Sequence, residues 1–247
     1  MKTFLTFLVA VLNVCVSGNY FYEFEGFSEK YNIYNLKALT KFLPINPVII
    51  EGGGYEGKDT LALARKFPLG TIYVFEPLES AFPKLEKTVR YTPNVHPFNL
   101  ALYEKSGTFP FYVCHGTYAQ SPVFELHSSL LKPLPSSEVH LLGPVVEVNC
   151  VSLADFCAQH SVDQIDMLWL STEGSELQIL RSMQNLIDKL TLVYIHSQFF
   201  TSREAISLFD DVKDYLVSKG FLLLSHFYLK DIHGDALFIK KERFFDE

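Results

Sequence analysis

Four glycines lie within six residues, directly after an acid, in Glu51-Gly52-Gly53-Gly54-Tyr55-Glu56-Gly57. Glycine allows positive φ angles and lets a ligand approach the main chain closely. In an open α/β sheet, ligands bind outside the carboxyl ends of the strands. A tight strand-to-helix turn without a ligand is the alternative, and this density of glycine disfavours it. We therefore interpret the stretch, with Gly53, Gly54 and Gly57, as a cofactor-binding loop.

The spacing of the glycines fits two cofactors. Gly52, Gly54 and Gly57 satisfy the dinucleotide pattern G-x-G-x-x-G, whereas Glu51, Gly53 and Gly57 satisfy E-x-G-x-x-x-G, which suits S-adenosylmethionine. A pyrophosphate placed ~5 Å from the Glu51 carboxylate would be repelled by roughly 3 kcal/mol at an effective dielectric of ~20. S-adenosylmethionine carries an ammonium and a sulfonium and has no phosphate. The acid therefore favours S-adenosylmethionine, and NAD is the less favoured alternative.

A second acid ends the next apolar run, Val74-Phe75-Glu76-Pro77. A carboxylate at this place can accept hydrogen bonds from both ribose hydroxyls of either cofactor. The alternative is a solvated acid at the end of a strand. We predict that Glu76 binds the ribose.

Strands and helices must alternate to position these residues. Short apolar runs predict strands, and amphipathic stretches predict helices, one of them capped by Ser80. The predicted strands cover residues 47–51, 71–76, 95–100, 107–113, 145–151, 165–171, 190–196, 221–224 and 236–240, and further helices cover 59–67, 153–160 and 202–219, with a helical face at Leu177, Leu180, Gln184 and Ile187. This alternation predicts an α/β, Rossmann-like fold with a parallel sheet covered by helices on both faces. The last two strands have too short a connection for a crossover helix, so they must be antiparallel.

The chain resembles the FkbM-type methyltransferases in a series of segments in the family's order. The main segments are Val48 to Gly57, Val74-Phe75-Glu76-Pro77, Asn99-Leu100-Ala101-Leu102 and Glu173-Gly174-Ser175-Glu176, and the resemblance covers residues 48–241. It implies a class I methyltransferase fold with a mostly parallel seven-stranded sheet and an antiparallel last strand. It also implies S-adenosylmethionine as cofactor, an oxygen atom as methyl acceptor, and a position for Ala101 near the adenine.

Three positions depart from the family pattern. Trp169 and Ser171 replace the lysine and aspartate of Lys-x-Asp, and His196 stands where the next strand often ends in an acid. An alcohol acceptor needs a base for its proton, and Glu173 and His196 are the catalytic candidates, because they follow or end neighbouring predicted strands. A helix-start acid and a structural histidine are the alternatives. Two functions stay open beside each other: an O-methyltransferase acting on a small molecule or glycan, and a catalytically silent methyltransferase-like binding module. An NAD-dependent oxidoreductase comes third.

The composition of the 247 residues agrees with one globular domain. The hydrophobic fraction is 48% and the net charge is −7, and without a basic stripe we expect no nucleic-acid partner. Lys2 and the apolar run from Phe4 to Val16 predict a signal peptide over residues 1–18, too short for a stable membrane span, followed by a single domain over 19–247. We expect export, or a cytoplasmic protein if the leader does not function. The histidine and cysteine spacings predict no metal site.

Overall fold

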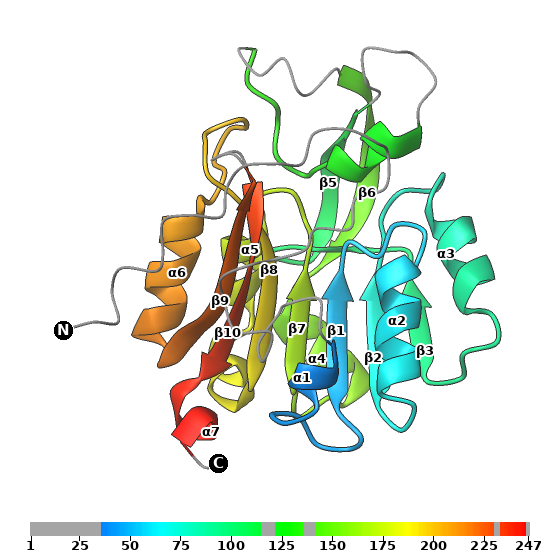
Figure 1. Cartoon of the computed structure of the whole chain (residues 1–247). Helices are drawn as coiled ribbons and strands as arrows, with labels where there is room; N and C mark the ends of the chain where they lie inside the picture. Colours follow the sequence, from blue (N-terminus) through cyan, green and yellow to red (C-terminus); the bar gives the residue numbers. More distant parts are fainter. Residues whose placement is uncertain (1–35, 115–121, 136–141, 230–232, 246–247) are drawn as a thin grey trace, which may run out of the picture.

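The computed structural model describes residues 36–114, 122–135, 142–229 and 233–245 of the chain. Seven strands form the central sheet in the order β3-β2-β1-β7-β8-β10-β9 (Figure 1). Their bounds are β1 Val48–Gly52, β2 Thr71–Phe75, β3 Val95–Phe98, β7 Met167–Leu170, β8 Leu192–Gln198, β9 Phe221–Leu229 and β10 His233–Lys240. All neighbours pair in parallel except β10, which is antiparallel to both β8 and β9. The predicted mostly parallel sheet with an antiparallel last strand is confirmed.

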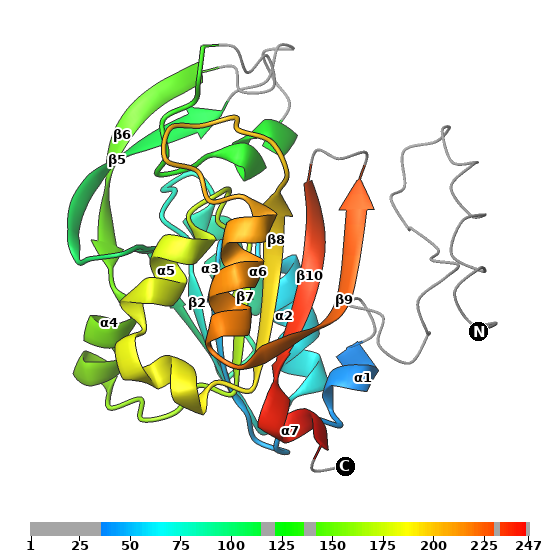
Figure 2. The same ribbon diagram turned by 90° about the vertical axis from the view of Figure 1, so that its left-hand side faces the viewer.

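Helices cover both faces of this sheet, as Figure 2 shows with the sheet seen from its edge. The helices are α1 Leu36–Leu39, α2 Lys58–Lys66, α3 Phe82–Val89, α4 Leu153–His160, α5 Glu176–Ser182, α6 Phe209–Ser218 and the terminal α7 Lys241–Phe245. Residues of α1, α2 and α3 belong to one buried hydrophobic cluster, and residues of α4, α5 and α6 belong to another. The sheet separates these clusters. Ile49 joins the first and Ile50 the second, which is why β1 reads as an unbroken apolar run.

A second, three-stranded sheet stands above the carboxyl ends of the central strands (Figure 1). Its strands are β4 Ala101–Leu102, β5 Gly107–Cys114 and β6 Leu142–Val151, in the order β4-β6-β5. The short 3-10 helix η2, Pro122–His127, lies in the excursion between β5 and β6. We call residues 103–149, which carry β5, η2 and most of β6, the roof.

Three predicted helices differ from the structure. The helix predicted over 202–219 begins at Phe209, because Asp211 caps the backbone N–H of Leu208 and Arg203 is buried in a loop instead. The helix predicted from Leu177 to Ile187 is interrupted at Gln184. This residue has a φ of 52° and begins the 3-10 helix η3, Gln184–Lys189. Ser80 does not cap α3; its hydroxyl donates to Glu125.

The predicted signal peptide, residues 1–18, lies outside the described residues. Among the residues that are described, no helix combines the length and the apolar character that a membrane crossing requires. The side chains of Cys114, Cys150 and Cys157 are buried.

Candidate active site

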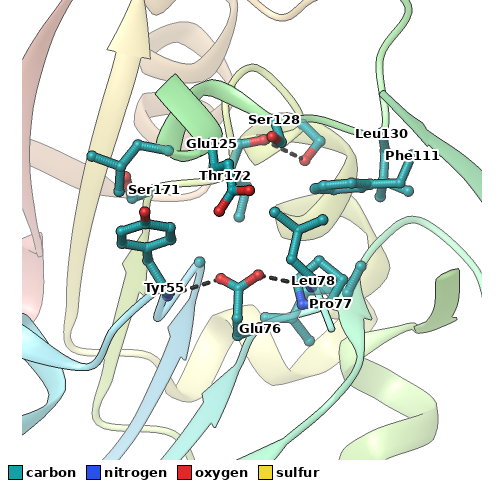
Figure 3. Close-up of a pocket in the computed structure, with 15 residues that line it drawn as sticks. Tyr55, Glu76, Pro77, Leu78, Phe111, Glu125, Ser128, Leu130, Ser171 and Thr172 are labelled. Atoms are coloured by element: carbon teal, nitrogen blue, oxygen red, sulfur yellow. Dashed lines mark hydrogen bonds between the residues drawn. The ribbon is translucent and has the colours of Figure 1, made fainter. Parts of the chain in front are cut away.

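A cavity opens where the roof faces the carboxyl ends of the central strands (Figure 3). Its empty volume, which includes space open to solvent, is about 570 Å³. The cavity wall consists of Gly53, Tyr55, Glu76, Pro77, Leu78, Ala101, Leu102, Phe111, Glu125, Leu126, Ser128, Leu130, Ser171, Thr172 and Ser175. Its charged members within the described part of the chain are two acids, with no lysine, arginine or histidine. A cationic ligand is favoured over a phosphorylated one.

Glu76 follows β2 and points into the cavity opposite Glu125 (Figure 3). Its Oε2 accepts a hydrogen bond from the Tyr55 N–H at 2.8 Å, and its Oε1 accepts one from the Leu78 N–H at 2.9 Å. Burial raises the pKa of Glu76 to about 7 against the effect of these two bonds, and Glu125 adds to the rise. A carboxylate oxygen has two lone pairs. The carboxylate is therefore fixed in orientation and can still accept hydrogen bonds from a ligand, and the ribose contact stays a prediction.

Glu51 lies within β1, is fully buried and does not form part of the cavity wall. Burial raises its pKa to about 8, opposed by the Thr60 hydroxyl, while Asp59 and Glu76 add to the rise. The Glu51 carboxyl and the Thr60 hydroxyl are buried, and among the described residues neither has a hydrogen-bond partner beyond the other. Buried carboxyl groups in folded proteins usually have more partners than this. Glu51 therefore fits a ligand that supplies a donor, such as an ammonium.

The predicted glycines have different roles. Gly53 lines the cavity with φ at 86°, and a Cβ there would come within 2.1 Å of the Ser171 carbonyl oxygen. Gly54 and Gly57 lie off the cavity wall, where a Cβ would meet side chains of β2 and α3 at 2.4 and 2.7 Å. Only Gly53 presents its backbone to the cavity, and the other two let the loop pass close to its neighbours. Ala101, which the resemblance placed near the adenine, is part of the cavity wall.

The two predicted catalytic residues are brought together, but behind the cavity wall. Oε1 of Glu173 lies 4.0 Å from Nε2 of His196, and neither residue is part of the wall. Nδ1 of His196 lies 2.8 Å from Oδ1 of Asp235, which also accepts a hydrogen bond from the Tyr194 hydroxyl at 2.9 Å. Nδ1 of His127 lies 3.5 Å from the other Glu173 oxygen. We call His127, Glu173, Tyr194, His196 and Asp235 the histidine network.

The charges in the histidine network stabilise one another. Burial alone would raise the pKa of Glu173, but the hydrogen bond and charge of His127, with His196 and Arg203, lower it to about 2. Burial alone would lower the pKa of His196, but Asp235 and Glu173 raise it to about 9. At neutral pH the network therefore contains a carboxylate at Glu173 and an imidazolium at His196.

Glu176 holds the backbone that presents Glu173. Its Oε1 accepts hydrogen bonds from the N–H and hydroxyl of Thr172, both at 3.0 Å, and from the Gly174 N–H at 3.3 Å. Glu173 itself has a φ of 56°, a left-handed conformation that costs free energy in a non-glycine residue. The hydrogen bonds that Glu176 accepts oppose that strain and keep Glu173 directed at the two imidazoles.

The departures from the family pattern have different surroundings. Ser171 lines the cavity at the end of β7. The Trp169 ring stacks on Tyr194 with 3.7 Å between the ring centroids and belongs to a hydrophobic cluster. The serine therefore changes the chemistry of the cavity wall, whereas the tryptophan changes the packing beside it.

Sequence reasoning missed His127, Asp235, Arg203 and Glu125. Asp235 had a signal, because antiparallel pairing of the strands that follow Leu192 and His233 places it opposite His196. Glu125 and His127 come from the short 3-10 helix η2 and Arg203 from the loop before α6, and no sequence pattern indicated that these segments meet. Among the described residues, no group of three or more histidine, cysteine, aspartate or glutamate side chains has a geometry suited to a metal ion.

Comparison with known proteins places these residues in a family. The sequence model of the methyltransferase FkbM domain matches residues 51–223. The chain is 23% identical to the 2-O-methyltransferase NoeI of Sinorhizobium fredii over 60% of its own length and 62% of NoeI, so it spans less than two thirds of that relative. It is 25% identical to Methyltransferase 1 of Beauveria bassiana, over 72% of this chain and 73% of that protein.

Solved structures of similar shape include Aeropyrum pernix fibrillarin in complex with S-adenosyl-L-methionine, with a TM-score of 0.45, 14% identity, and coverage of 80% of this chain and 69% of that chain. Another is M. capricolum TrmK in complex with S-adenosyl-homocysteine, with a TM-score of 0.46, 14% identity, and coverage of 84% and 68%.

Proposed function

This chain belongs to the FkbM methyltransferase domain family, and from that membership we propose that it is an S-adenosylmethionine-dependent O-methyltransferase acting on a small molecule or a glycan. The observation that carries the proposal is the set of acidic residues at and behind the cavity wall. Glu76 and Glu125 line the cavity, and no lysine, arginine or histidine of the described residues does. Oε2 of Glu51 is buried and has no hydrogen-bond partner beyond Thr60 among the described residues. A site of this kind fits a cofactor with positive charge and no phosphate.

Different residues of the site would bind different parts of this cofactor. Glu76 would accept hydrogen bonds from the ribose hydroxyls, because its carboxylate is already oriented by the backbone N–H groups of Tyr55 and Leu78. Glu51 would offset the positive charge of the amino acid end, and Ala101 and Leu102 offer an apolar surface to the adenine. When bound, S-adenosylmethionine supplies an electrophilic methyl group on a sulfonium sulfur.

The acceptor is proposed to be a hydroxyl group. NoeI is described as a 2-O-methyltransferase, and the proposal extends an oxygen acceptor from that relative to this chain. Methyl transfer needs the acceptor oxygen to be aligned with the methyl carbon and a group that receives the hydroxyl proton. Ser171 and Thr172 line the cavity beside the loop that carries Glu173, and this side of the cavity is where we expect the acceptor.

Calorimetric titration of the full chain with S-adenosylmethionine, and separately with NAD, tests the cofactor. We expect S-adenosylmethionine to bind and Glu76→Ala to weaken its binding about 100-fold, as for the loss of two hydrogen bonds to a charged group. Glu147→Ala removes an exposed acid of β6 outside the cavity wall and is the matched control. Glu76→Gln keeps the shape of the side chain and guards against loss of folding in the alanine variant.

The outcomes separate the candidate functions. Binding of NAD in place of S-adenosylmethionine would overturn the cofactor. Tight binding of S-adenosylmethionine, with no S-adenosylhomocysteine released in the presence of any hydroxylated acceptor, would favour the silent binding module. The observation that favours this second candidate is Ser171, which stands at the position of the family's aspartate and lines the cavity.

A further inference from the structure

Three exposed apolar or aromatic side chains lie on the edge of the central sheet opposite the roof (Figure 1). Ile45 is 77% exposed, Leu69 64% and Tyr91 90%, the highest fractions among the large apolar side chains of the described residues. They lie in the segments that precede β1, β2 and β3. We call these segments, residues 40–47, 65–70 and 90–94, the amino edge. Single exposed apolar residues are common, whereas several on neighbouring segments indicate an interaction surface.

Backbone hydrogen bonds join the three segments of the amino edge. The Thr71 N–H donates to the Pro47 carbonyl at 2.8 Å, which connects the segments before β1 and β2. The Ile72 N–H donates to the Asn94 carbonyl at 2.9 Å, and the Asn94 side-chain amide donates to the Phe67 carbonyl at 3.0 Å. These two bonds connect the segments before β2 and β3. The amino edge is therefore one continuous surface.

Positive charges accompany the apolar side chains of the amino edge. Its segments contain no aspartate or glutamate, and their cations are Lys41, Arg65, Lys66 and Arg90. Within the described part of the chain, none of these four side chains forms an ion pair. The whole chain has a net charge of −7. The amino edge is thus basic on an acidic protein, and its charges are available to a partner.

This combination of side chains matches the surface of an anionic membrane. Tyrosine is favoured at the level of the lipid headgroups, and leucine and isoleucine are favoured at the boundary of the acyl chains. Lysine and arginine extend toward the headgroups, where each cation strengthens binding to anionic lipid. A nucleic acid would match the cations and not the apolar side chains. A bilayer offers an apolar layer and a negative surface to the same edge.

We propose that the amino edge binds the protein to an anionic lipid bilayer. Ile45, Leu69 and Tyr91 enter the interface, and the four cations contact the headgroups. The cavity lies at the carboxyl ends of the same sheet, on the side of the roof (Figure 1). A protein bound in this way keeps the cavity directed toward water. The inference is independent of the proposed function, because it involves other residues and no methyl transfer.

Vesicle flotation with the full chain tests the proposal. We expect binding to phosphatidylcholine vesicles that contain about 30% phosphatidylserine, and binding about tenfold weaker to pure phosphatidylcholine. Raising the salt concentration from about 0.1 M to about 0.5 M should weaken the binding, because exposed charges are screened. Absence of binding to the anionic vesicles would overturn the proposal.

Two double variants separate the contributions of charge and apolar surface. Lys66→Gln with Arg90→Gln should weaken binding to anionic vesicles about 30-fold, because each lost cation contributes about fivefold. Ile45→Ser with Leu69→Ser should weaken it about tenfold, because less apolar surface enters the interface. None of the four side chains is buried, so the denaturant midpoint should stay unchanged.

The roof provides matched controls on the opposite side of the molecule. Lys105→Gln with Lys132→Gln removes two exposed cations, and Val145→Ser removes an exposed apolar side chain. Neither change should affect vesicle binding. A loss in these controls as large as in the variants of the amino edge would overturn the proposal.

The predicted leader needs its own control, because an apolar run is itself able to enter a bilayer. Leu8→Asp in the full chain weakens that insertion, and the losses in the two double variants should persist in its presence. Binding that is abolished by Leu8→Asp and unaffected by the amino-edge variants would overturn the proposal. So would a dimer that dissociates in Leu69→Ser without any vesicle binding, which would assign the surface to a second copy of the chain.

Discussion

The cavity wall and the histidine network are adjacent and contain acids of similar burial, but their electrostatics are opposite. Burial raises the pKa of Glu76 to about 7 and that of Glu51, just behind the wall, to about 8. In the network, neighbouring cations overcome burial and lower the pKa of Glu173 to about 2. The difference comes from the partners of each acid: Glu173 has His127, His196 and Arg203 around it, whereas no lysine, arginine or histidine of the described residues lines the cavity.

This comparison distinguishes residues that bind a ligand from residues that stabilise the fold. A buried acid without a counter-charge destabilises the fold and becomes favourable only when a cation arrives. A buried acid with its counter-charges is already satisfied and fixes the positions of its neighbours. We therefore expect changes in the cavity to affect cofactor binding first, and changes in the network to affect stability first.

The largest expected effect is on stability, in His196→Leu. The substitution leaves Glu173 and Asp235 buried without their shared cation, and breaking a buried ion pair in this way costs about 3 kcal/mol or more. Denaturant unfolding at pH 6 measures the loss, and His96→Gln, at an exposed histidine on β3, is the control. A decrease of less than about 1 kcal/mol in the free energy of unfolding would mean that the histidine network does not stabilise the fold in this way.

Glu51→Gln should show the opposite pattern. We expect the affinity for S-adenosylmethionine to fall about 30-fold, which corresponds to about 2 kcal/mol for a hydrogen bond to a charged group. The free energy of unfolding at pH 7.5 should stay equal or rise, because the raised pKa means that ionisation favours the unfolded chain above pH 4.5. A loss of stability as large as that in His196→Leu would erase the distinction between the two regions.

The pH dependence of cofactor binding should follow the raised pKa values. Below pH 7 the free protein holds protons on Glu51 and Glu76 that a cationic ligand must displace. Because both protons are displaced, affinity should increase on the order of 100-fold from pH 6.0 to 7.5, with release of protons on binding. Calorimetry in buffers of different ionisation enthalpy measures both quantities. The dependence should flatten in Glu51→Gln, and affinity that falls over this range would contradict the assignment.

The smallest effect is expected at Glu125. This acid raises the pKa of Glu76 across the cavity, so Glu125→Gln should let Glu76 ionise at lower pH. The affinity at pH 7.5 should change less than about threefold, because Glu125 is only half-buried and its charge is screened by solvent. The midpoint of the pH dependence of cofactor affinity should move to lower pH. A shift to higher pH would contradict the repulsion between Glu125 and Glu76.

The sequence predicted the cofactor side of the fold because its signals are local. Ile49 and Ile50 read as a strand buried on both faces, and Glu51 and Glu76 are placed by the strands that carry or precede them. The network required contacts between distant segments. Arg203 falls in a stretch with helical periodicity, yet its guanidinium donates to the carbonyls of His127 and Leu131. The periodicity of a local segment does not indicate a contact with a distant one, so only Glu173 and His196 of the network could be identified from the sequence.

The roof leaves the main fold and returns to it at neighbouring points. Ala101 pairs with Cys150 and Leu102 with Val151, and the Tyr103 N–H donates to the Val151 carbonyl. A segment whose two ends adjoin can change in length or sequence with little effect on the scaffold that carries it. The roof contributes Phe111, Glu125 and Ser128 to the cavity, while the segments that follow β1 and β2 contribute Gly53 and Glu76. The roof can therefore vary in evolution while the central sheet and the loops that follow β1 and β2 stay unchanged.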